Sequence, residues 1–305
     1  MKLATSPGGV YFHRIQDECE KIRMLHDAGF SCLDFSFWAM KPNSPFMTDD
    51  WKAASQQVRS CMDEIGMEGV QAHSPAGNPL NEDEAEWMLH NTIQSLRCCA
   101  VMGIPQVVVH AGVCGDSREE FFEANRTFYR KLIPYIEETG VSVLIENGAA
   151  APYYLITGKD MREMIDFIGH PGFHALWDVG HGNIGDLDQY ESLTALGSEL
   201  HGLHIHDNFC RPGNNNGWLN DAHTFPGTGT VNFDAIMQAL LDIDYKGCFT
   251  FEVDAPSIFP KKPFYKDGKE VDRLSALSMD IKMDYVRLVY KTGKYFLEQY
   301  GCFEK

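Results

Sequence analysis

Nine residues whose side chains bind metals or move protons lie at or just after short apolar runs of the chain. They are His73, His110, Glu146, Asp178, His181, His206, Asp221, His223 and Glu252. Six of the apolar runs end directly in one of these residues, and they read GVQAH, QVVVH, VSVLIE, FHALWD, GLHIH and CFTFE. A buried carboxylate or imidazole is costly unless it is paired or bound to metal. Six such endings therefore favour one shared site over separate core residues.

The apolar runs alternate with longer amphipathic runs, which predicts eight strand–helix units. The expected strands span residues 2–5, 32–35, 69–73, 106–110, 141–146, 173–178, 202–206 and 248–252. The expected helices span residues 15–28, 49–65, 82–102, 118–138, 159–168, 187–195, 233–241 and 277–300. Strands rich in Val, Ile, Leu and Phe are typical of parallel sheets that are covered on both faces.

This alternation predicts an α/β fold, in which residues 1–305 form a single-domain (β/α)8 TIM barrel. An open, doubly wound sheet is the alternative, but its sites gather at one switch point and not along six strands. Residues 254–277, after the eighth expected strand, form a long Pro-containing loop. A loop of this length is typical of a lid or of a contact with another subunit, in a homo-oligomer or with a different chain.

The composition argues against a nucleic-acid surface, because 43 acidic residues outnumber 26 basic ones and the formal net charge is −17. Nine Cys residues without a CxxC pair indicate a reducing compartment. The sequence shows no apolar stretch typical of a signal peptide or a membrane span. We therefore expect a cytoplasmic protein that does not bind a membrane.

Four of the nine residues end the last four expected strands, and they are Glu146, Asp178, His206 and Glu252. In a barrel, the carboxyl ends of the strands converge on the face that carries active sites. Oxygen and nitrogen donors of this kind suit Mn²⁺, Mg²⁺, Co²⁺ or Zn²⁺. The sequence therefore predicts one divalent metal bound by these four residues. His204, two residues before His206, is interpreted as a core residue or a support of the ligands.

Five short motifs, in their order and spacing, resemble the xylose isomerase-like barrel superfamily; they are LIEN, WDVGH, HIHDN, DAH with PGTG, and FEVD. That group includes sugar isomerases and epimerases, inosose dehydratases and endonuclease IV. The resemblance implies the same four ligands and assigns Glu146 and Glu252 as acid and base on opposite faces of the substrate. The expected reaction is the isomerisation or epimerisation of a small carbohydrate or polyol-derived ketone, by removal of a proton next to a carbonyl.

The remaining candidates would contact the substrate. His181, three residues after a ligand, is the expected general acid or base, and Trp38 could stack on a sugar ring. Hydroxyl groups would be bound by His73, His110, Asp221 and His223. Arg211 could also bind substrate, but the stretch HDNFCR departs from the HxGExNR-like stretch of some ketose 3-epimerases. Few Lys or Arg residues end the expected strands, which favours an unphosphorylated substrate.

Three alternatives remain open. In a three-zinc phosphodiesterase of the endonuclease IV type, the additional ligands would be His73, His110, His181, Asp221 and His223. A lyase, a dehydratase or a C-glycoside-cleaving subunit would use the same proton removal and then expel a leaving group. A non-catalytic sugar-binding barrel is the third alternative, and the completeness of the ligand set counts against it.

Overall fold

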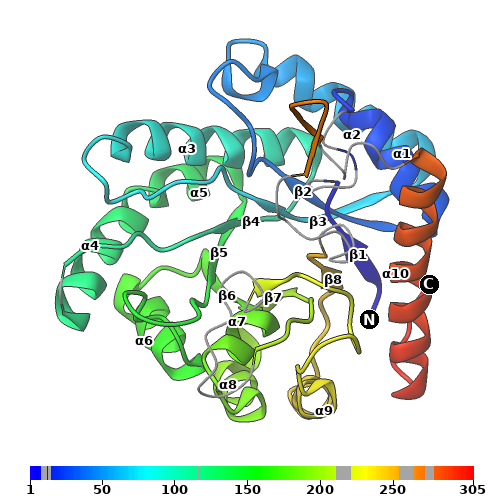
Figure 1. The fold of residues 1–305 in the computed structure, drawn as a ribbon. Helices are drawn as coiled ribbons and strands as arrows, with labels where there is room; N and C mark the ends of the chain where they lie inside the picture. Colours follow the sequence, from blue (N-terminus) through cyan, green and yellow to red (C-terminus); the bar gives the residue numbers. More distant parts are fainter. Residues whose placement is uncertain (8–11, 13–14, 116, 211–220, 254–263, 272–277) are drawn as a thin grey trace.

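The computed structural model describes residues 1–305 except 8–11, 13–14, 116, 211–220, 254–263 and 272–277. Eight parallel strands form one sheet in the order β7-β6-β5-β4-β3-β2-β1-β8 and enclose a barrel (Figure 1). The strands are β1 Leu3–Thr5, β2 Cys32–Ser36, β3 Glu68–His73, β4 Gln106–Val109, β5 Ser142–Glu146, β6 Phe173–Asp178, β7 Leu200–His204 and β8 Phe249–Phe251. Every predicted strand is present, and β6 has the predicted bounds.

Hydrogen bonds just beyond the end of β7 close the barrel between its last two strands. The N–H of Ile205 donates to the carbonyl of Thr250 at 2.8 Å, and the N–H of Glu252 donates to the carbonyl of Ile205 at 3.1 Å. Ile205 thus forms a parallel bridge with Phe251. The predicted (β/α)8 TIM barrel is confirmed.

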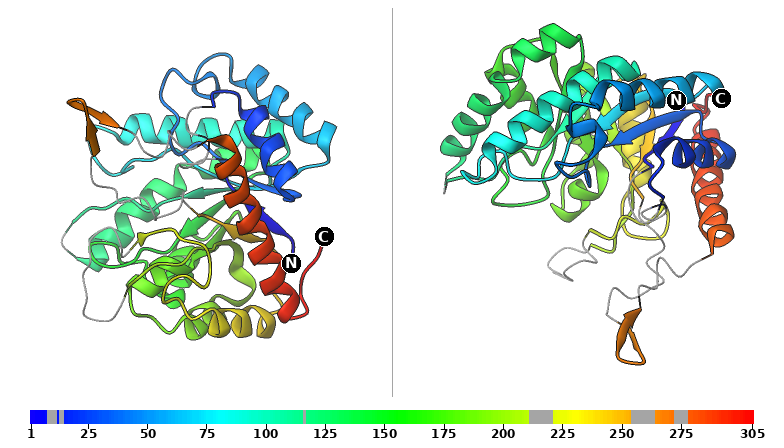
Figure 2. Two further views of the ribbon diagram at one scale, coloured as in Figure 1. Left: turned by 45° about the vertical axis from the view of Figure 1, so that its right-hand side comes forward. Right: turned by 90° about the horizontal axis from the view of Figure 1, so that it is seen from above.

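Helices connect the strands and cover the outside of the barrel (Figure 2). They are α1 Glu18–Ala28, α2 Trp51–Ile65, α3 Ala85–Met102, α4 Arg118–Arg130, α5 Ile133–Thr139, α6 Gly158–Ile168, α7 Val179–Ile184, α8 Gln189–Leu196, α9 Phe233–Asp242 and α10 Met279–Gln299, with 3-10 turns η1 Pro45–Met47 and η2 Gly197–Glu199. The predicted helix 118–138 is two helices, because Pro134 has no N–H and is tolerated only in a first turn, here that of α5. None of the described helices is long and apolar enough to cross a membrane.

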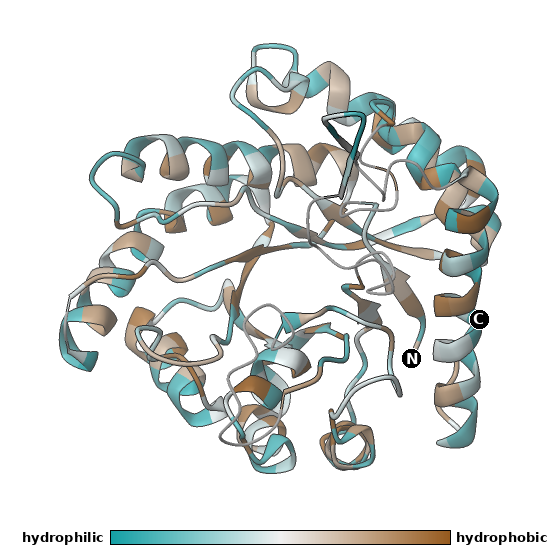
Figure 3. Cartoon of the chain, in the orientation of Figure 1, coloured by the Kyte–Doolittle hydropathy of each residue, from teal (hydrophilic) through white to brown (hydrophobic). Residues whose placement is uncertain are grey.

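Alternation along the strands produces two apolar regions. The larger one lies between strands and helices and includes Trp177 and Tyr129, both fully buried. Figure 3 shows hydrophobic residues along the strands and a mixture of hydrophobic and hydrophilic residues along the helices. Val108, Leu144 and Leu176 form a second, small cluster. Leu144 and Leu176 lie two residues before the ends of β5 and β6, so their side chains support the residues above them on the same face.

The predicted loop 254–277 contains a short antiparallel hairpin, β9 Phe264–Lys266 paired with β10 Lys269–Val271. Asp267 and Gly268 form its turn with φ of 53° and 73°, the left-handed values that a two-residue hairpin turn requires. Figure 2 shows the hairpin standing away from the body of the barrel. The rest of this predicted lid or contact segment lies outside the described residues.

Candidate metal centre and active site

The carboxyl ends of the last four strands bring together Glu146, Asp178, His204 and Glu252, with one donor atom of each within 4.8 Å of the others. His204 Nδ1 lies 3.2 Å from Glu146 Oε1 and 3.3 Å from Glu252 Oε2. The same nitrogen lies 4.0 Å from Asp178 Oδ2. Three carboxylates and one imidazole nitrogen are a donor set that fits a divalent cation.

This quartet contains His204, where the sequence analysis expected His206. The reason is the length of β7, which ends at His204, with His204 as the register partner of Asp178 on β6. The sequence pattern GLHIH places both histidines on one face of a strand, and only the actual strand end decides which one reaches Glu146, Asp178 and Glu252. The predicted strand was continued two residues too far.

His206 belongs to a second group of potential ligands, together with Asp221 and His223. Its Nε2 lies 3.1 Å from both Oδ1 and Oδ2 of Asp178, and its ring stacks on that of His223 at 3.8 Å. The Nε2 of His223 lies 3.1 Å from Asp221 Oδ1. The second group therefore adjoins the quartet through Asp178.

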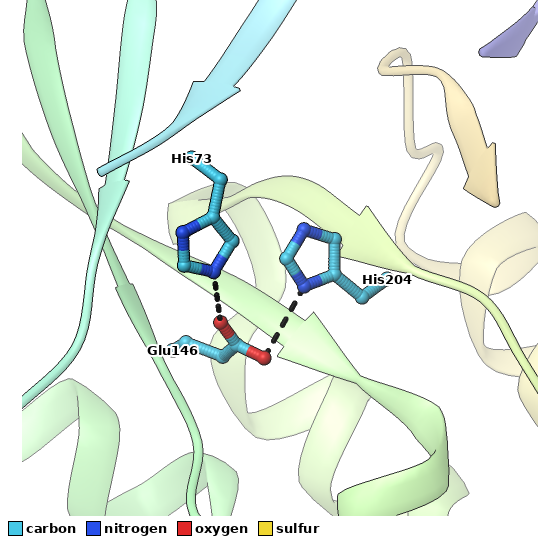
Figure 4. Close-up of side chains that lie close together, drawn as sticks. All are labelled: His73, Glu146 and His204. Atoms are coloured by element: carbon cyan, nitrogen blue, oxygen red, sulfur yellow. Dashed lines mark hydrogen bonds and ion pairs between the residues drawn. The ribbon is translucent and has the colours of Figure 1, made fainter. Parts of the chain in front are cut away.

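His73 and His110 approach the quartet from β3 and from the residue after β4. His110 Nε2 lies 2.7 Å from Glu146 Oε2, and His73 Nε2 lies 3.7 Å from the same oxygen. Figure 4 shows His73 and His204 on either side of the Glu146 carboxylate, each directed at one oxygen. Glu146 is thus shared between the quartet and a third group of potential ligands, which consists of His73, Glu146 and His204.

The charges of these buried groups depend on one another. Burial raises the pKa of Glu146, but His110 and His204 outweigh this and hold that pKa well below its usual range. In the same way His181 and His206 hold the pKa of Asp178 below its usual range, against burial. Burial lowers the pKa of His204, but Glu252 and Glu146 raise it well above normal. The carboxylates of Glu146 and Asp178 are therefore ionised at neutral pH, as metal ligands must be.

His181 lies in α7, a short helix that is not among the helices expected from the sequence. Asp178 is its N-cap, and its carboxylate accepts a hydrogen bond from the N–H of His181 at 2.7 Å. The ring Nδ1 donates to the carbonyl of Asn147 at 2.9 Å, which leaves Nε2 without its proton when the ring is neutral. Burial lowers the pKa of His181, but Asp178 and Glu146 outweigh it and raise the pKa to about 9.

Asp207, which the sequence analysis did not single out, holds the loop that carries Asp221 and His223. Its buried carboxylate accepts hydrogen bonds from four backbone N–H groups, those of Asn208, Gly227, Gly229 and Val231. Its backbone N–H and C=O pair with those of Thr224, next to His223. The HIHDN and PGTG motifs therefore meet through one carboxylate, and this contact positions the second group.

A pocket of about 610 Å³ opens above the quartet, a volume typical of small-molecule sites. Its described lining includes Glu146, Glu252 and His181, but no Lys or Arg. Trp38 stands at its rim, 44% exposed, with its ring 4.8 Å from that of His73. The predicted substrate contact Arg211 lies outside the described residues.

The amino-acid sequence matches the family described as "Xylose isomerase-like TIM barrel" over residues 22–274. The chain belongs to this family. The resemblance inferred from the five motifs is therefore confirmed at the level of the family.

Several proteins similar to this xylose isomerase-like barrel have been described. The L-ribulose 3-epimerase of Methylomonas sp. (strain DH-1) is 27% identical over 134 residues, 44% of this chain and 42% of that protein. The structure of D-psicose 3-epimerase with D-tagatose from Clostridium cellulolyticum H10 has a TM-score of 0.73 at 16% identity, and the match covers 97% of this chain and 99% of that one. The IolI protein with a bound zinc atom has a TM-score of 0.71 at 14% identity, covering 95% and 96%. At these identities the structural matches show a shared fold.

Proposed function

We propose that this chain is a divalent-metal-dependent isomerase or epimerase of a small, unphosphorylated carbohydrate or polyol-derived ketone. The observation that carries the proposal is the cluster of Glu146, Asp178, His204 and Glu252, two of which, Glu146 and Glu252, line a pocket of about 610 Å³. Support also comes from relatives described as an L-ribulose 3-epimerase and a D-psicose 3-epimerase.

The four residues of the quartet would hold one ion of Mn²⁺, Mg²⁺, Co²⁺ or Zn²⁺. When bound there, the ion supplies a Lewis acid for the carbonyl and neighbouring hydroxyl oxygens of the substrate and stabilises the enediolate. Asp178 is fully buried, and its carboxylate also caps α7, so its role is to hold the ion and to position His181. His204 is fully buried as well, and contributes Nδ1.

Glu146 and Glu252 exchange protons with the substrate in this proposal. The side chain of Glu252 is 31% exposed and that of Glu146 only 3%. Glu252 therefore faces the open side of the pocket, and its Oε1 is left to take the proton because Oε2 faces His204 and His223. Glu146 acts from the opposite side, where His110, 2.7 Å from its Oε2, can pass a proton on.

Histidines around the pocket would bind the hydroxyl groups of the substrate. His181 lines the pocket and keeps its Nδ1 proton on a backbone carbonyl, so its Nε2 is the atom available to a substrate oxygen. His73 and His223 have the same arrangement, with Nδ1 2.9 Å from the carbonyls of Ser74 and Glu252 respectively. The exposed face of Trp38 at the rim would pack against a sugar ring.

The lining of the pocket favours a neutral substrate. Phosphate groups are usually bound by Arg, by Lys or by helix N-termini. Neither Lys nor Arg occurs among the described lining residues. Small unphosphorylated ketoses and keto-glycosides are therefore the class to test.

The proposal is tested by incubating the protein with a panel of unphosphorylated ketoses in deuterium oxide, with and without added Mn²⁺. We expect incorporation of deuterium at the carbon next to the carbonyl of one substrate, detected by mass spectrometry and NMR, and loss of the incorporation after chelation of the metal. Incorporation followed by loss of a leaving group would identify a lyase or C-glycoside-cleaving enzyme. Incorporation that persists in metal-free protein would contradict the proposal.

A second candidate is a three-zinc phosphodiesterase of the endonuclease IV type. Its specific support is that two further ligand groups adjoin the quartet, one with His73 and Glu146 and one with Asp221 and His223. The formal net charge of −17 counts against a DNA substrate. Hydrolysis of an abasic DNA duplex or of a simple phosphodiester, with up to three zinc ions per chain, would favour this candidate over the sugar enzyme.

A further inference from the structure

Asp34 is a buried carboxylate inside the barrel that none of the steps above uses. It lies in the middle of β2, is 1% exposed, and belongs to the lining of the pocket. Its Oδ2 accepts a hydrogen bond from Gln71 Nε2 at 3.2 Å, while its Oδ1 has no hydrogen-bond partner among the described residues. A buried carboxylate with so few partners destabilises the fold, so a function for it is to be expected.

The nearest imidazole is that of His204, whose Nε2 lies 3.5 Å from Asp34 Oδ2. This nitrogen is buried and has no hydrogen-bond partner within the described part of the chain. The other ring nitrogen, Nδ1, faces the carboxylates of Glu146 and Glu252. His204 therefore lies between a pair of carboxylates that belong to the quartet and one carboxylate that does not.

The orientation of His204 is opposite to that of the other histidines of the pocket. His73, His181 and His223 each direct Nδ1 at a backbone carbonyl 2.9 Å away. A backbone carbonyl thus fixes the proton on Nδ1 of those three rings and leaves Nε2 to face another side chain or a substrate. His204 instead directs Nδ1 at Glu146 and Glu252, so its proton must be kept on Nε2, which lies 3.5 Å from the Asp34 carboxylate.

We propose that Asp34 is a positioning residue that keeps the proton of His204 on Nε2 and so frees Nδ1 to bind the metal ion. Histidine ligands commonly donate their second N–H to a carboxylate, which fixes the tautomer and the ring orientation. Gln71 completes the arrangement, because its amide N–H holds the Asp34 carboxylate from the neighbouring strand, where the two residues are register partners. This inference rests on the proposed function only in requiring that the quartet binds metal.

The test measures the affinity of the metal-free protein for Mn²⁺ by equilibrium dialysis, in wild type and in Asp34→Asn. We expect the dissociation constant to rise about tenfold to a hundredfold, as for other partners of histidine ligands. The same substitution is then made in the His204→Gln background, whose three carboxylates still bind Mn²⁺ weakly. There Asp34→Asn should change the affinity less than about twofold, because a partner that acts through His204 has nothing left to act on.

A control separates this role from general support of the core. Thr92→Val, in α3, removes another buried polar atom that has no hydrogen-bond partner in the described part of the chain, and should leave the Mn²⁺ affinity unchanged. If Asp34→Asn does not fold, Gln71→Leu is measured in its place. We expect Gln71→Leu to lower the Mn²⁺ affinity by a smaller factor, and to have no such effect in the His204→Gln background. An unchanged Mn²⁺ affinity in Asp34→Asn would overturn this inference but not the proposed function. An equal loss of Mn²⁺ affinity with and without His204 would have the same meaning. Wild-type protein that takes up no Mn²⁺ would overturn both this inference and the proposed function.

Discussion

Asp178 and His204 are register partners at the ends of neighbouring strands, and His204 Nδ1 lies 4.0 Å from Asp178 Oδ2. Partners in a parallel sheet that point to the same face keep their spacing as long as the sheet is intact. Asp178 therefore lies between two histidines. His204 is level with it in the sheet, and His206 follows two residues later, with its Nε2 3.1 Å from both carboxylate oxygens of Asp178. The two histidines should differ in what they bind.

The first prediction separates these two histidines. Loss of a residue that hydrogen-bonds a metal ligand typically weakens metal binding about tenfold to hundredfold. His204→Gln should weaken Mn²⁺ binding by more than this, because it removes a ligand itself. His206→Gln should leave the first equivalent of metal bound, because its contact is with a carboxylate that keeps its other partners. Equilibrium dialysis of the two variants checks this, and stronger impairment in His206→Gln would return the ligand role to His206.

Much of the barrel could be predicted from the sequence, because apolar periodicity reports strands that are buried on both faces. The positions of Glu146 and Asp178 followed from the same pattern, since both end their strands. His204 and His206 could not be separated in this way, because both continue one alternation and the end of β7 depends on its pairing with β6.

The supporting residues were harder to find. Asp34 is a single acidic residue in an apolar run, a signal that does not name its partner, which lies on a strand distant in sequence. The role of Asp207 depends on four backbone N–H groups, which carry no side-chain signal at all. The short helix α7 was missed because its two glycines, Gly180 and Gly182, disfavour a helix. Close packing requires them, because a Cβ would clash with His206 at Gly180 and would crowd Gln189 at Gly182.

The second prediction concerns Glu252 as a base. Glu252→Gln should lower kcat by about 10²–10⁴-fold, the usual contribution of general acid–base catalysis, while the protein keeps its metal. The metal content must be measured in the same sample by elemental analysis, since Glu252 is also a ligand. Glu137→Gln, which changes an exposed carboxylate on α5, is the matched control and should have wild-type activity. Full activity in Glu252→Gln would exclude the mechanism with two carboxylates.

The third prediction concerns the loop anchor. Asp207→Ala should lower the free energy of unfolding by about 3 kcal/mol or more, because several backbone N–H groups lose their acceptor. The Mn²⁺ affinity should change less than about tenfold, which is the smallest loss typical of a residue that hydrogen-bonds a metal ligand. The reason is that the quartet lies at the ends of strands and not on this loop. Denaturant unfolding and dialysis measure the two quantities, with the exposed Asp166→Asn as control. An unchanged stability would show that the loop is held by other contacts.

The fourth prediction concerns pH and the start of α6. Asp160 accepts hydrogen bonds from the N–H and the hydroxyl of Thr157 and forms an ion pair with Arg118. Burial raises the pKa of Asp160, but the contacts with Thr157 and Arg118 outweigh it and lower that pKa below its usual value. A lowered pKa stabilises the folded state above the unfolded pKa of about 3.9, and this contribution is lost as the pH falls through the lower folded value.

Asp160→Asn should therefore cost about 1 kcal/mol near neutral pH, as loss of a helix cap does. The difference from wild type should be constant between about pH 5 and 7 and should shrink below about pH 4. Urea unfolding at several pH values measures it. A difference that grows as the pH falls would contradict the assigned direction of the pKa shift.

Metal content tests most directly whether Glu146, Asp178, His204 and Glu252 hold a single catalytic ion. Wild-type protein and His204→Gln are purified without added metal and measured by elemental analysis. We expect close to one equivalent of a divalent metal such as manganese, cobalt, magnesium or zinc in wild type, and loss of most of it in His204→Gln. Two to three equivalents of zinc in wild type, or no metal with none taken up on addition, would contradict it.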